Sequence, residues 1–284
     1  MEHPKQILSR HGLVAKKSLG QNFLHDASLL SAIVAAASVQ EHDNVLEIGP
    51  GLGALTQHLS DAAARVVAVE LDQRLLPVLE EQIGNRSNVE IVHGDVLAHD
   101  PRAWFGDEPY KVVANVPYYI TGAILEHVLG RKNKPEVMVI TVQKEVAERI
   151  AAQPGDMTLL AVSVQIYGAV QIVREISAGS FWPRPDVDSA ILRFDLIADH
   201  ALSADEEKLF FRLVRVGFSQ KRKQLQKNLR ALGFERNEIV ALLQSTGISP
   251  QRRAETLSIE EWLKLQDAVR RSQESQSPAP GKTN

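Results

Sequence analysis

The chain of 284 residues contains no cysteine. This absence excludes disulfides, zinc sites built on thiolates and a cysteine nucleophile. The sequence also lacks any run that approaches the roughly 20 apolar residues of a membrane span, and its first residues lack the apolar core of a signal peptide. We therefore expect a cytoplasmic protein that makes no contact with a membrane. Apolar residues make up 44% of the chain, which is enough to fill the cores of about two domains.

Acidic residues are missing from the stretch 208–230, although the formal net charge of the whole chain is only -3. The basic residues of this stretch are Lys208, Arg212, Arg215, Lys221, Arg222, Lys223, Lys227 and Arg230. Two sets of three have the spacing i, i+4, i+7 of a helix face: Lys208, Arg212 and Arg215, and Lys223, Lys227 and Arg230. Scattered basic residues usually only solvate a helix. Here the like charges repel one another, and a nucleic-acid backbone would offset that repulsion, so we predict an RNA-binding surface.

Short β-branched runs alternate with helical patterns in the first two-thirds of the chain. The runs are Val45–Ile48, Val66–Glu70, Val89–His93, Val112–Asn115 and Val137–Val142. This alternation predicts an α/β fold with a doubly wound, mostly parallel sheet. Farther along, Ala161–Tyr167 is expected to be a helix or a strand, and Val170–Ile176 and Ile191–Leu196 are expected to be strands.

From about Leu202 the apolar pattern is helical only, which predicts a small all-helical domain. Ser258 and Glu261 form a capping box that opens its last helix. We therefore expect a first domain over residues 1–200 and a helical domain over residues 201–271. Residues 272–284 are rich in Ser, Gln and Pro and are expected to be a disordered tail.

The segment Asn115-Val-Pro-Tyr-Tyr-Ile120 follows one of the predicted strands. Asn, Pro and an aromatic residue in this order suit the methylation of an exocyclic amine, whose lone pair is delocalised into the base. The carboxamide oxygen of Asn115 can accept one amine N–H, and a backbone carbonyl beside the donor-less Pro117 can accept the other. Tyr118 offers a flat face to an extruded base. An ordinary strand end followed by a turn is the alternative interpretation.

A glycine-rich loop, Val45-Leu-Glu-Ile-Gly-Pro-Gly-Leu-Gly-Ala-Leu-Thr56, follows the first predicted strand. With Glu70 about twenty residues farther on, it fits a dinucleotide site, in which the acidic residue binds a ribose hydroxyl. S-adenosylmethionine has no pyrophosphate, and its sites also use an acidic residue before the glycines, here Glu47, and an Asp after a later strand, here Asp95. A tight turn is the simpler interpretation of a lone glycine cluster. Glu70, Asp95 and Asn115 all end predicted strands, where open α/β sheets bind ligands, and this series favours S-adenosylmethionine.

Four motifs together resemble the ribosomal RNA adenine dimethyltransferases. They are Leu19-Gly-Gln-Asn-Phe-Leu24, the glycine loop, Asn115-Val-Pro-Tyr118 and Phe181-Trp-Pro-Arg-Pro-Asp-Val-Asp-Ser189. The resemblance extends over the chain except its final residues. It implies a Rossmann-like class I S-adenosylmethionine-dependent methyltransferase domain followed by a helical domain that binds RNA or the ribosome. More narrowly, the chain is similar to bacterial enzymes that dimethylate N6 of two adjacent adenosines in the hairpin near the 3′ end of 16S rRNA, during biogenesis of the small ribosomal subunit.

The resemblance also implies the roles of individual residues. The residues that contact S-adenosylmethionine would be Asn22, Leu24, Gly49, Glu70, Asp95 and Asn115. The catalytic residues would be Asn115 and Tyr118, which position the target adenine, and Phe181, which closes over it.

Two positions depart from the usual pattern of these enzymes, which more often have Leu at Val116 and Asn at Tyr119. Val116 keeps the backbone carbonyl that the chemistry needs, whereas Tyr119 is expected to alter how a flanking nucleotide stacks. In the first motif, Phe23 is expected to dock into the core, while Asn22 is placed to hydrogen-bond the methionine end of the cofactor.

We expect direct in-line transfer of the methyl group from the sulfonium to N6 of adenine, by a monomer and without a metal or a covalent intermediate. Three alternatives stay open. A relative that acts on large-subunit RNA would share every catalytic motif. An RNA-binding assembly factor would need binding more than catalysis. A nicotinamide-dependent oxidoreductase would share the glycines and Glu70 but would give no role to Asn115 and Tyr118.

Overall fold

The computed structural model describes residues 2–131, 133–197 and 202–276. The chain divides into two compact units, and each is described by itself. Of the described residues, 2–131, 133–148 and 167–197 form the first unit, and 149–166 and 202–276 form the second. Of the helices within the described ranges, none is long and apolar enough to cross a bilayer.

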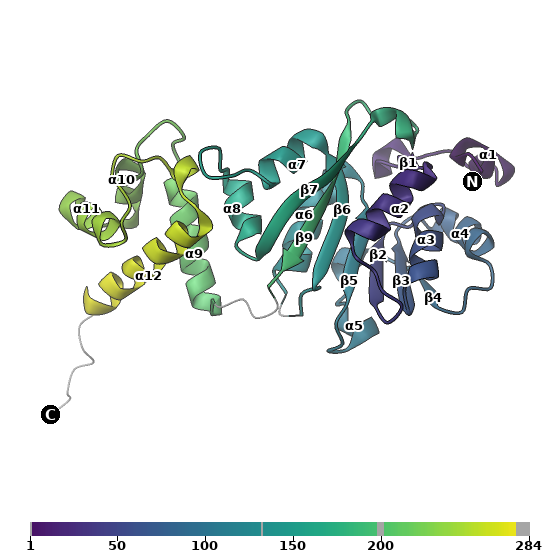
Figure 1. Ribbon diagram of the computed structural model, residues 1–284, viewed down its shortest axis with the longest axis horizontal. Helices are drawn as coiled ribbons and strands as arrows, with labels where there is room; N and C mark the ends of the chain where they lie inside the picture. The colour runs from purple at the N-terminus through teal and green to yellow at the C-terminus, as the bar shows by residue number, and fades with distance from the viewer. Residues whose placement is uncertain (1, 132, 198–201, 277–284) are drawn as a thin grey trace. The chain divides into compact units, whose positions relative to one another are not determined.

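The first unit is built on a seven-stranded sheet with the strand order β4-β3-β2-β5-β6-β9-β7 (Figure 1). Its strands are β2 (Asn44–Ile48), β3 (Arg65–Glu70), β4 (Val89–His93), β5 (Lys111–Asn115), β6 (Val137–Gln143), β7 (Gly168–Ile176) and β9 (Ser189–Leu196). Strands β4, β3, β2, β5 and β6 are parallel, β9 pairs antiparallel with β6, and β7 pairs antiparallel with β9 at the edge of the sheet. The predicted doubly wound, mostly parallel sheet is confirmed.

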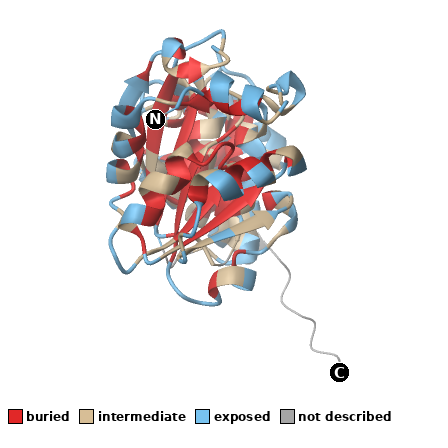
Figure 2. Ribbon diagram, turned by 90° about the vertical axis from the view of Figure 1, so that its right-hand side faces the viewer, coloured by how far each residue is buried: buried red, intermediate tan, exposed pale blue. Residues whose placement is uncertain are grey.

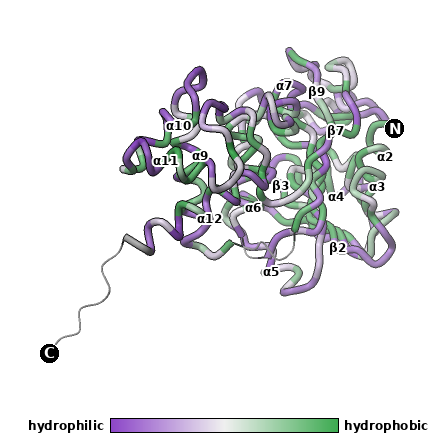
Figure 3. The backbone as a smooth tube through the Cα atoms, turned by 60° about the vertical axis from the view of Figure 1, so that its left-hand side comes forward, coloured by the Kyte–Doolittle hydropathy of each residue, from purple (hydrophilic) through white to green (hydrophobic). Residues whose placement is uncertain are grey.

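Helices cover this sheet and bury its strands. The helices of the first unit are α1 (Pro4–Arg10), α2 (Ala27–Ala36), α3 (Ala54–Ala62), α4 (Leu76–Ile83), α5 (Arg102–Phe105), α6 (Thr121–Leu129) and α7 (Lys144–Ile150), the last of which runs into the second unit. Apolar side chains of α2 and α3, such as Ile33 and Leu59, pack on Val45 and Val113 of the sheet. The middle strands β2, β3, β5 and β6 are buried on both faces and give the red strands of Figure 2 and green stretches of Figure 3, whereas the edge strand β7 is largely exposed.

The second unit is helical within its described part. It contains α8 (Leu159–Gln165), α9 (Ala204–Gly217), α10 (Leu225–Asn228), α11 (Arg236–Ser245) and α12 (Ile259–Gln276). Trp262 of α12 is fully buried against Gly217, where any side chain would collide with the indole ring. The predicted capping box opens α12, because the Ser258 N–H donates to Glu261 Oε2 at 2.9 Å and the Glu261 N–H donates to Ser258 Oγ at 3.3 Å.

The division of the chain differs from the expected boundary at residue 200. Residues 149–166 lie with the helical unit, because the N–H groups of Gly155 and Met157 donate to the Glu255 carbonyl at 2.9 and 3.1 Å. The segment Ala161–Tyr167, expected as a helix or a strand, contributes to helix α8, which the Thr158 hydroxyl caps by accepting from the Ala161 N–H.

Two expectations for the carboxyl-terminal region are wrong. Lys223, Lys227 and Arg230 do not share one helix face: Lys223 precedes α10, and Arg230 lies in the 3₁₀ helix Leu229–Leu232. The Asn228 side chain binds the carbonyls of Gly217 and Gln220, which holds the chain in a turn before α10. Residues 272–276, expected in a disordered tail, belong to α12. Arg270 supports these last turns by pairing with Asp267 at 2.6 Å and Glu274 at 3.2 Å. The rest of the expected tail, 277–284, lies outside the described residues.

Candidate active site

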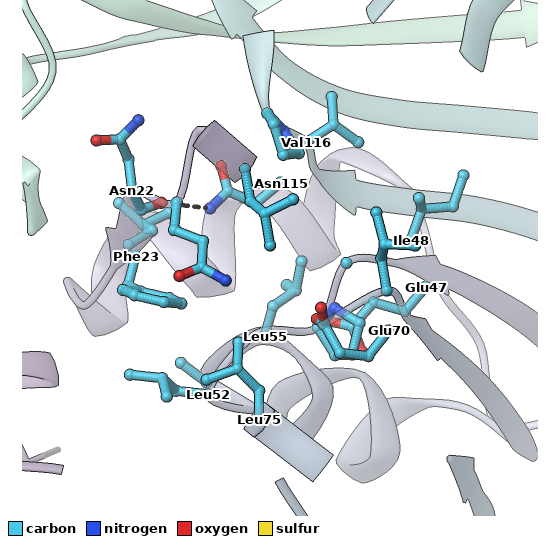
Figure 4. A pocket seen from close by; sticks show the side chains of 18 of the residues that line it. Asn22, Phe23, Glu47, Ile48, Leu52, Leu55, Glu70, Leu75, Asn115 and Val116 are labelled. Atoms are coloured by element: carbon cyan, nitrogen blue, oxygen red, sulfur yellow. Dashed lines mark hydrogen bonds between the residues drawn. The ribbon is translucent and has the colours of Figure 1, made fainter. Parts of the chain in front are cut away.

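One cavity of the first unit lies at the carboxyl ends of the parallel strands, where β2 lies between β3 and β5 (Figure 4). The chain changes direction across the sheet at this point, which is where open α/β sheets bind their ligands. All the predicted site residues line the cavity: Asn22, Leu24, Gly49, Glu70, Asp95, Asn115, Tyr118 and Phe181. The fold thus brings together residues from well-separated segments of the sequence.

The glycine loop connects β2 to α3 and lines the cavity. Gly49 has a φ of 69° in the left-handed region, and a Cβ at this position would meet no atom within 4 Å. Gly51 also has a positive φ, and a Cβ there would lie 3.0 Å from the ring of Phe23. Glycine is therefore required at Gly51 both by the backbone conformation and by the close approach of Phe23.

Glu70, at the end of β3, ties this loop to the next strand. Its Oε2 accepts from the Gly51 N–H at 3.0 Å, and its Oε1 accepts from the Asp72 N–H at 2.7 Å. Burial raises the pKa of Glu70, and the two backbone hydrogen bonds oppose that effect. Asp72 in turn accepts from Arg74 at 2.6 Å and from Gln21 at 2.8 Å, and the Arg74 guanidinium lowers the pKa of Asp72 to about 2.

Glu47 lies beneath the glycine loop with 1% of its surface exposed. Within the described part of the chain, neither of its carboxyl oxygens has a hydrogen bond of good geometry. Burial raises the pKa of Glu47 to about 8, while the nearby Thr56 hydroxyl lowers it and Glu70 raises it further. A buried polar group without a partner is costly, so this carboxyl group marks a place where a bound molecule can supply a donor.

Asn115 and Tyr118, at the end of β5 and just after it, line the same cavity as the loop. Asn115 ends β5, and its Nδ2 donates to the Asn22 carbonyl at 3.4 Å (Figure 4). Tyr118 opens the 3₁₀ helix Tyr118–Ile120 directly after Pro117, and its hydroxyl group lies 2.6 Å from Ser189 Oγ. Burial raises the pKa of Tyr118, so its phenol stays protonated at neutral pH.

The amino-terminal motif is held against the Phe181 segment by a two-stranded antiparallel sheet. Strand β1 (Phe23–Leu24) pairs with β8 (Phe181–Trp182), and Leu24 is the register partner of Phe181. Phe181 is only 3% exposed and belongs to the core as well as to the cavity wall. The prediction that Phe23 docks into the core is confirmed, since Phe23 packs with Leu52 and Leu75.

Asp95 lies at the exposed rim of the cavity, after β4. Its Oδ1 accepts from the Leu97 N–H at 3.0 Å and so caps the 3₁₀ helix Val96–Ala98. Tyr119, which the sequence linked to a flanking nucleotide, also lines the cavity, and so does Gln21, which was not assigned to the site from the sequence. Gln21 belongs to a motif that the sequence did single out, so its position beside Asn22 was the available signal.

Comparison with known proteins agrees with this geometry. The sheet order, the glycine loop and the polar strand ends define a Rossmann-like class I methyltransferase fold. The chain belongs to the family described as "Ribosomal RNA adenine dimethylase", which it matches over residues 12–270.

Curated relatives and solved structures are similar to this chain over most of its length. "Ribosomal RNA small subunit methyltransferase A" of Dehalococcoides mccartyi (strain CBDB1) is 46% identical over 93% of this chain and 92% of its own length. The protein of the same name from Clostridium botulinum (strain Langeland) is 40% identical over 93% of this chain and 98% of its own. The crystal structure of the 23S rRNA methyltransferase ErmE has a TM-score of 0.74 at 29% identity, and covers 88% of this chain and 100% of that one. A dimethyladenosine transferase from Plasmodium falciparum has the same TM-score at 25% identity, with 86% and 95% covered.

Proposed function

We propose that this chain dimethylates N6 of two adjacent adenosines in the hairpin near the 3′ end of 16S rRNA, during biogenesis of the small ribosomal subunit. One observation carries the proposal: Asn115 and Tyr118 face the same cavity as the glycine loop, Glu70 and Asp95. A base amine held by Asn115 and Tyr118 would therefore lie in the same cavity as a ligand held by the glycine loop, Glu70 and Asp95. A ribosomal substrate would place the chain where bacterial ribosomes are assembled, in the cytoplasm.

S-adenosylmethionine is the methyl donor that the family implies, and it supplies a methyl group already activated on a sulfonium. The residues that we assign to it are Asn22, Leu24, Gly49, Glu70, Asp95 and Asn115. Two features of the cavity fit this ligand. Within the described residues the buried Glu47 carboxyl has no hydrogen bond of good geometry, and the space beside Gly49 is open. A ligand with an amine and ribose hydroxyls would bring such donors.

Asn115 and its neighbours supply the acceptors for the base amine. The carboxamide oxygen of Asn115 would accept one N–H of the amine. The Pro117 carbonyl is already engaged with the Ile120 N–H at 3.2 Å, whereas no hydrogen bond between described residues uses the Val116 carbonyl. Val116 is therefore the available second acceptor. Two acceptors in fixed positions turn the nitrogen lone pair out of conjugation and toward the methyl donor.

Tyr118 and Phe181 would hold the plane of the base. Tyr118 is half-buried, so one part of its ring faces the cavity while its hydroxyl group is anchored. Phe181 is fixed in the cavity wall by the pairing of β1 with β8. An extruded base that stacks on such rings keeps its amine within reach of Asn115.

The helical unit would supply the affinity for RNA. All eight basic residues of the stretch 208–230 are exposed. Among the ion pairs between described residues, Lys208 pairs with Asp205 at 3.0 Å and the other seven take part in none. Exposed cations without acidic partners are suited to neutralise phosphates. Binding of the RNA as a monomer is part of the same proposal.

Large-subunit RNA is the alternative substrate, because ErmE shares the fold over nearly the whole chain. The relatives named for the small subunit are more similar in sequence, at 40 to 46% identity against 29%. We therefore favour the small subunit.

The proposal is tested by transfer of labelled methyl groups to small ribosomal subunits that lack the modification, with large subunits and free RNA in parallel. We expect dimethyladenosine from small subunits alone, and label in large-subunit RNA would contradict the assignment. Asn115→Ala should lower the rate about 10²- to 10³-fold, as the loss of one transition-state hydrogen bond does. If this variant still binds subunits as the wild type does, catalysis and binding are separate properties of the chain, and an assembly role can persist without catalysis.

A further inference from the structure

We propose that Thr141 and Ser189 are positioning residues. Their buried hydroxyl groups hydrogen-bond the side chains of Asn115 and Tyr118, respectively, and hold them in place. The inference rests on the proposed function, because it takes Asn115 and Tyr118 as the groups that hold the target base. Neither hydroxyl residue touches the cavity itself, since neither is among its lining residues.

Thr141 lies beside Asn115 in the sheet. The two residues are register partners on the parallel strands β5 and β6, and the Thr141 Oγ1–H donates to Asn115 Oδ1. On its other side, Asn115 Nδ2 donates to the Asn22 carbonyl at 3.4 Å. The opposite orientation of the carboxamide would set Oδ1 against the Asn22 carbonyl, two acceptors with no proton between them. The two contacts together therefore fix which end of the carboxamide is the oxygen.

This orientation leaves the acceptor usable. A carbonyl oxygen has two lone pairs, and Thr141 occupies one of them. The second lone pair remains for an N–H of the substrate. A hydrogen bond from Thr141 also polarises the carboxamide, which strengthens its oxygen as an acceptor.

The hydroxyl group of Thr141 is unusual in its strand, because every other residue of β6 before Gln143 is apolar. Thr141 has no exposed surface, and its neighbours Ile140 and Val142 have none either. Valine has the same shape and would carry no cost of burying a hydroxyl group. Asn115 is the partner that satisfies this hydroxyl group within the described residues.

Ser189 anchors the Tyr118 side chain by a hydrogen bond, as Thr141 anchors the Asn115 side chain. Ser189 opens β9, has no exposed surface, and lies with its Oγ 2.6 Å from the Tyr118 hydroxyl oxygen. The hydroxyl oxygen lies at the far end of the ring axis, so a bond there holds that axis in one direction and keeps the ring beside the site that the base would occupy. The two anchors are close in the sheet, because Ser189 is the register partner of Gln143, two residues after Thr141.

The anchors act on the orientation of Asn115 and Tyr118. Of the six residues assigned to S-adenosylmethionine they touch Asn115 alone, and the other five keep their contacts. We therefore expect Thr141→Val to lower kcat about tenfold, the effect of removing one hydrogen bond, while the Kd of S-adenosylmethionine stays within about twofold of wild type. Thr141→Ser keeps the hydroxyl group and should restore most of kcat. Ser189→Ala and Tyr118→Phe should each lower kcat to a similar extent, and the double variant should be no slower than either, because both remove the same bond.

The experiment measures kcat, KM for ribosomal subunits and the Kd of S-adenosylmethionine for these variants, on whichever of the small or large subunits the wild type methylates. Ser60→Ala is a matched control. Ser60 is buried and its Oγ accepts from Arg86, but it does not line the cavity. This control should lose stability and keep the kcat of the wild type.

Wild-type kcat in both Thr141→Val and Ser189→Ala would overturn the inference, and so would equal losses in Thr141→Val and Thr141→Ser. Failure of the proposed function is a separate result, because it would appear in the wild type as label on large subunits. The kcat of each variant relative to the kcat of the wild type would still decide whether the hydroxyl groups position Asn115 and Tyr118.

Discussion

The side chain of Glu70, at the end of β3, holds Gly51 of the loop that follows β2: Glu70 Oε2 accepts a hydrogen bond from the Gly51 backbone N–H at 3.0 Å. This bond fixes the glycine loop before any ligand arrives. The ring of Phe23 lies close to the same glycine, so the amino-terminal motif, the loop and the end of β3 form one connected structure. We expect the affinity for S-adenosylmethionine to depend on that connection.

Gly51→Ala should weaken cofactor binding and lower stability. The new Cβ would lie 3.0 Å from the Phe23 ring, and alanine at a φ of 59° costs about 1 kcal/mol by itself. Gly233→Ala is the matched control, because Gly233 is in the left-handed region with a φ of 92° and a ψ of 4° but has open space around its Cβ. Calorimetric titration should show weaker binding for Gly51→Ala alone, and thermal unfolding should show a larger loss for it than for Gly233→Ala. Equal effects of the two substitutions would mean that the contact with Phe23 is unimportant.

Glu47 should make the stability of the ligand-free protein depend on pH. Burial raises its pKa to about 8, from an ordinary value of 4.5. Between these two values the folded chain binds more protons than the unfolded chain, so the contribution of Glu47 is full below 4.5 and is lost as the pH rises toward 8. Glu47→Gln has no ionisable group at this position, so the variant does not lose this stability as the pH rises. Its free energy of unfolding relative to wild type should therefore rise by about 3 kcal/mol between about pH 5 and pH 8.

Urea unfolding at several pH values measures this difference directly. Glu41→Gln, at an exposed position, is the matched control. The prediction would be contradicted if the difference in free energy of unfolding between Glu47→Gln and the wild type stayed the same from about pH 5 to about pH 8.

Tyr119 should contribute to substrate binding and not to cofactor binding. Its ring is 61% exposed at the rim of the cavity, beside Tyr118, and it packs on Gly20. Stacking of a base on an aromatic ring contributes about 1–3 kcal/mol, so Tyr119→Ala should raise KM for the subunit roughly tenfold. Tyr119→Phe should behave as the wild type in the same assay. If Tyr119→Asn keeps both the rate and the substrate preference, no flanking nucleotide stacks on this ring.

Neutralising the basic turn before α10 should weaken RNA binding without slowing the chemical step. Lys221, Arg222 and Lys223 are exposed, and their replacement by Gln removes three cations that can neutralise phosphates. KM should rise, and the slope of log affinity against log salt should fall by about one for each phosphate that is no longer neutralised. The control replaces Arg236, Lys264 and Arg271, three exposed basic residues elsewhere in the helical unit. Equal losses of affinity in both triple variants would indicate that net charge matters and not this surface.

The sequence predicted the sheet and the edge that binds ligands, because both follow from local patterns. Each parallel strand is an apolar run, and Glu70, Asp95 and Asn115 come at or just after the ends of such runs. Once these strands are neighbours in one sheet, their ends must meet. The glycines of the loop carried the same local signal, since only glycine suits the backbone at Gly51.

The remaining features depend on contacts between distant segments. Thr141 and Ser189 reach Asn115 and Tyr118 only through the register of β6 with β5 and β9, which no spacing in the sequence reveals. The start of α10 after Lys223 depends on the Asn228 side chain reaching back to Gly217. Residues 149–166 join the helical unit through the backbone carbonyl of Glu255, a contact that leaves no pattern in side-chain polarity.

The central claim is tested most directly by mapping the methyl groups on 16S rRNA after reaction of the purified chain with unmodified small subunits. We expect mass spectrometry of the RNA fragments to find two methyl groups on N6 of each of two adjacent adenosines in the hairpin near the 3′ end, and about 10²- to 10³-fold slower formation of them with Asn115→Ala. Methylation at other positions, or dimethyladenosine confined to large-subunit RNA, would contradict the account.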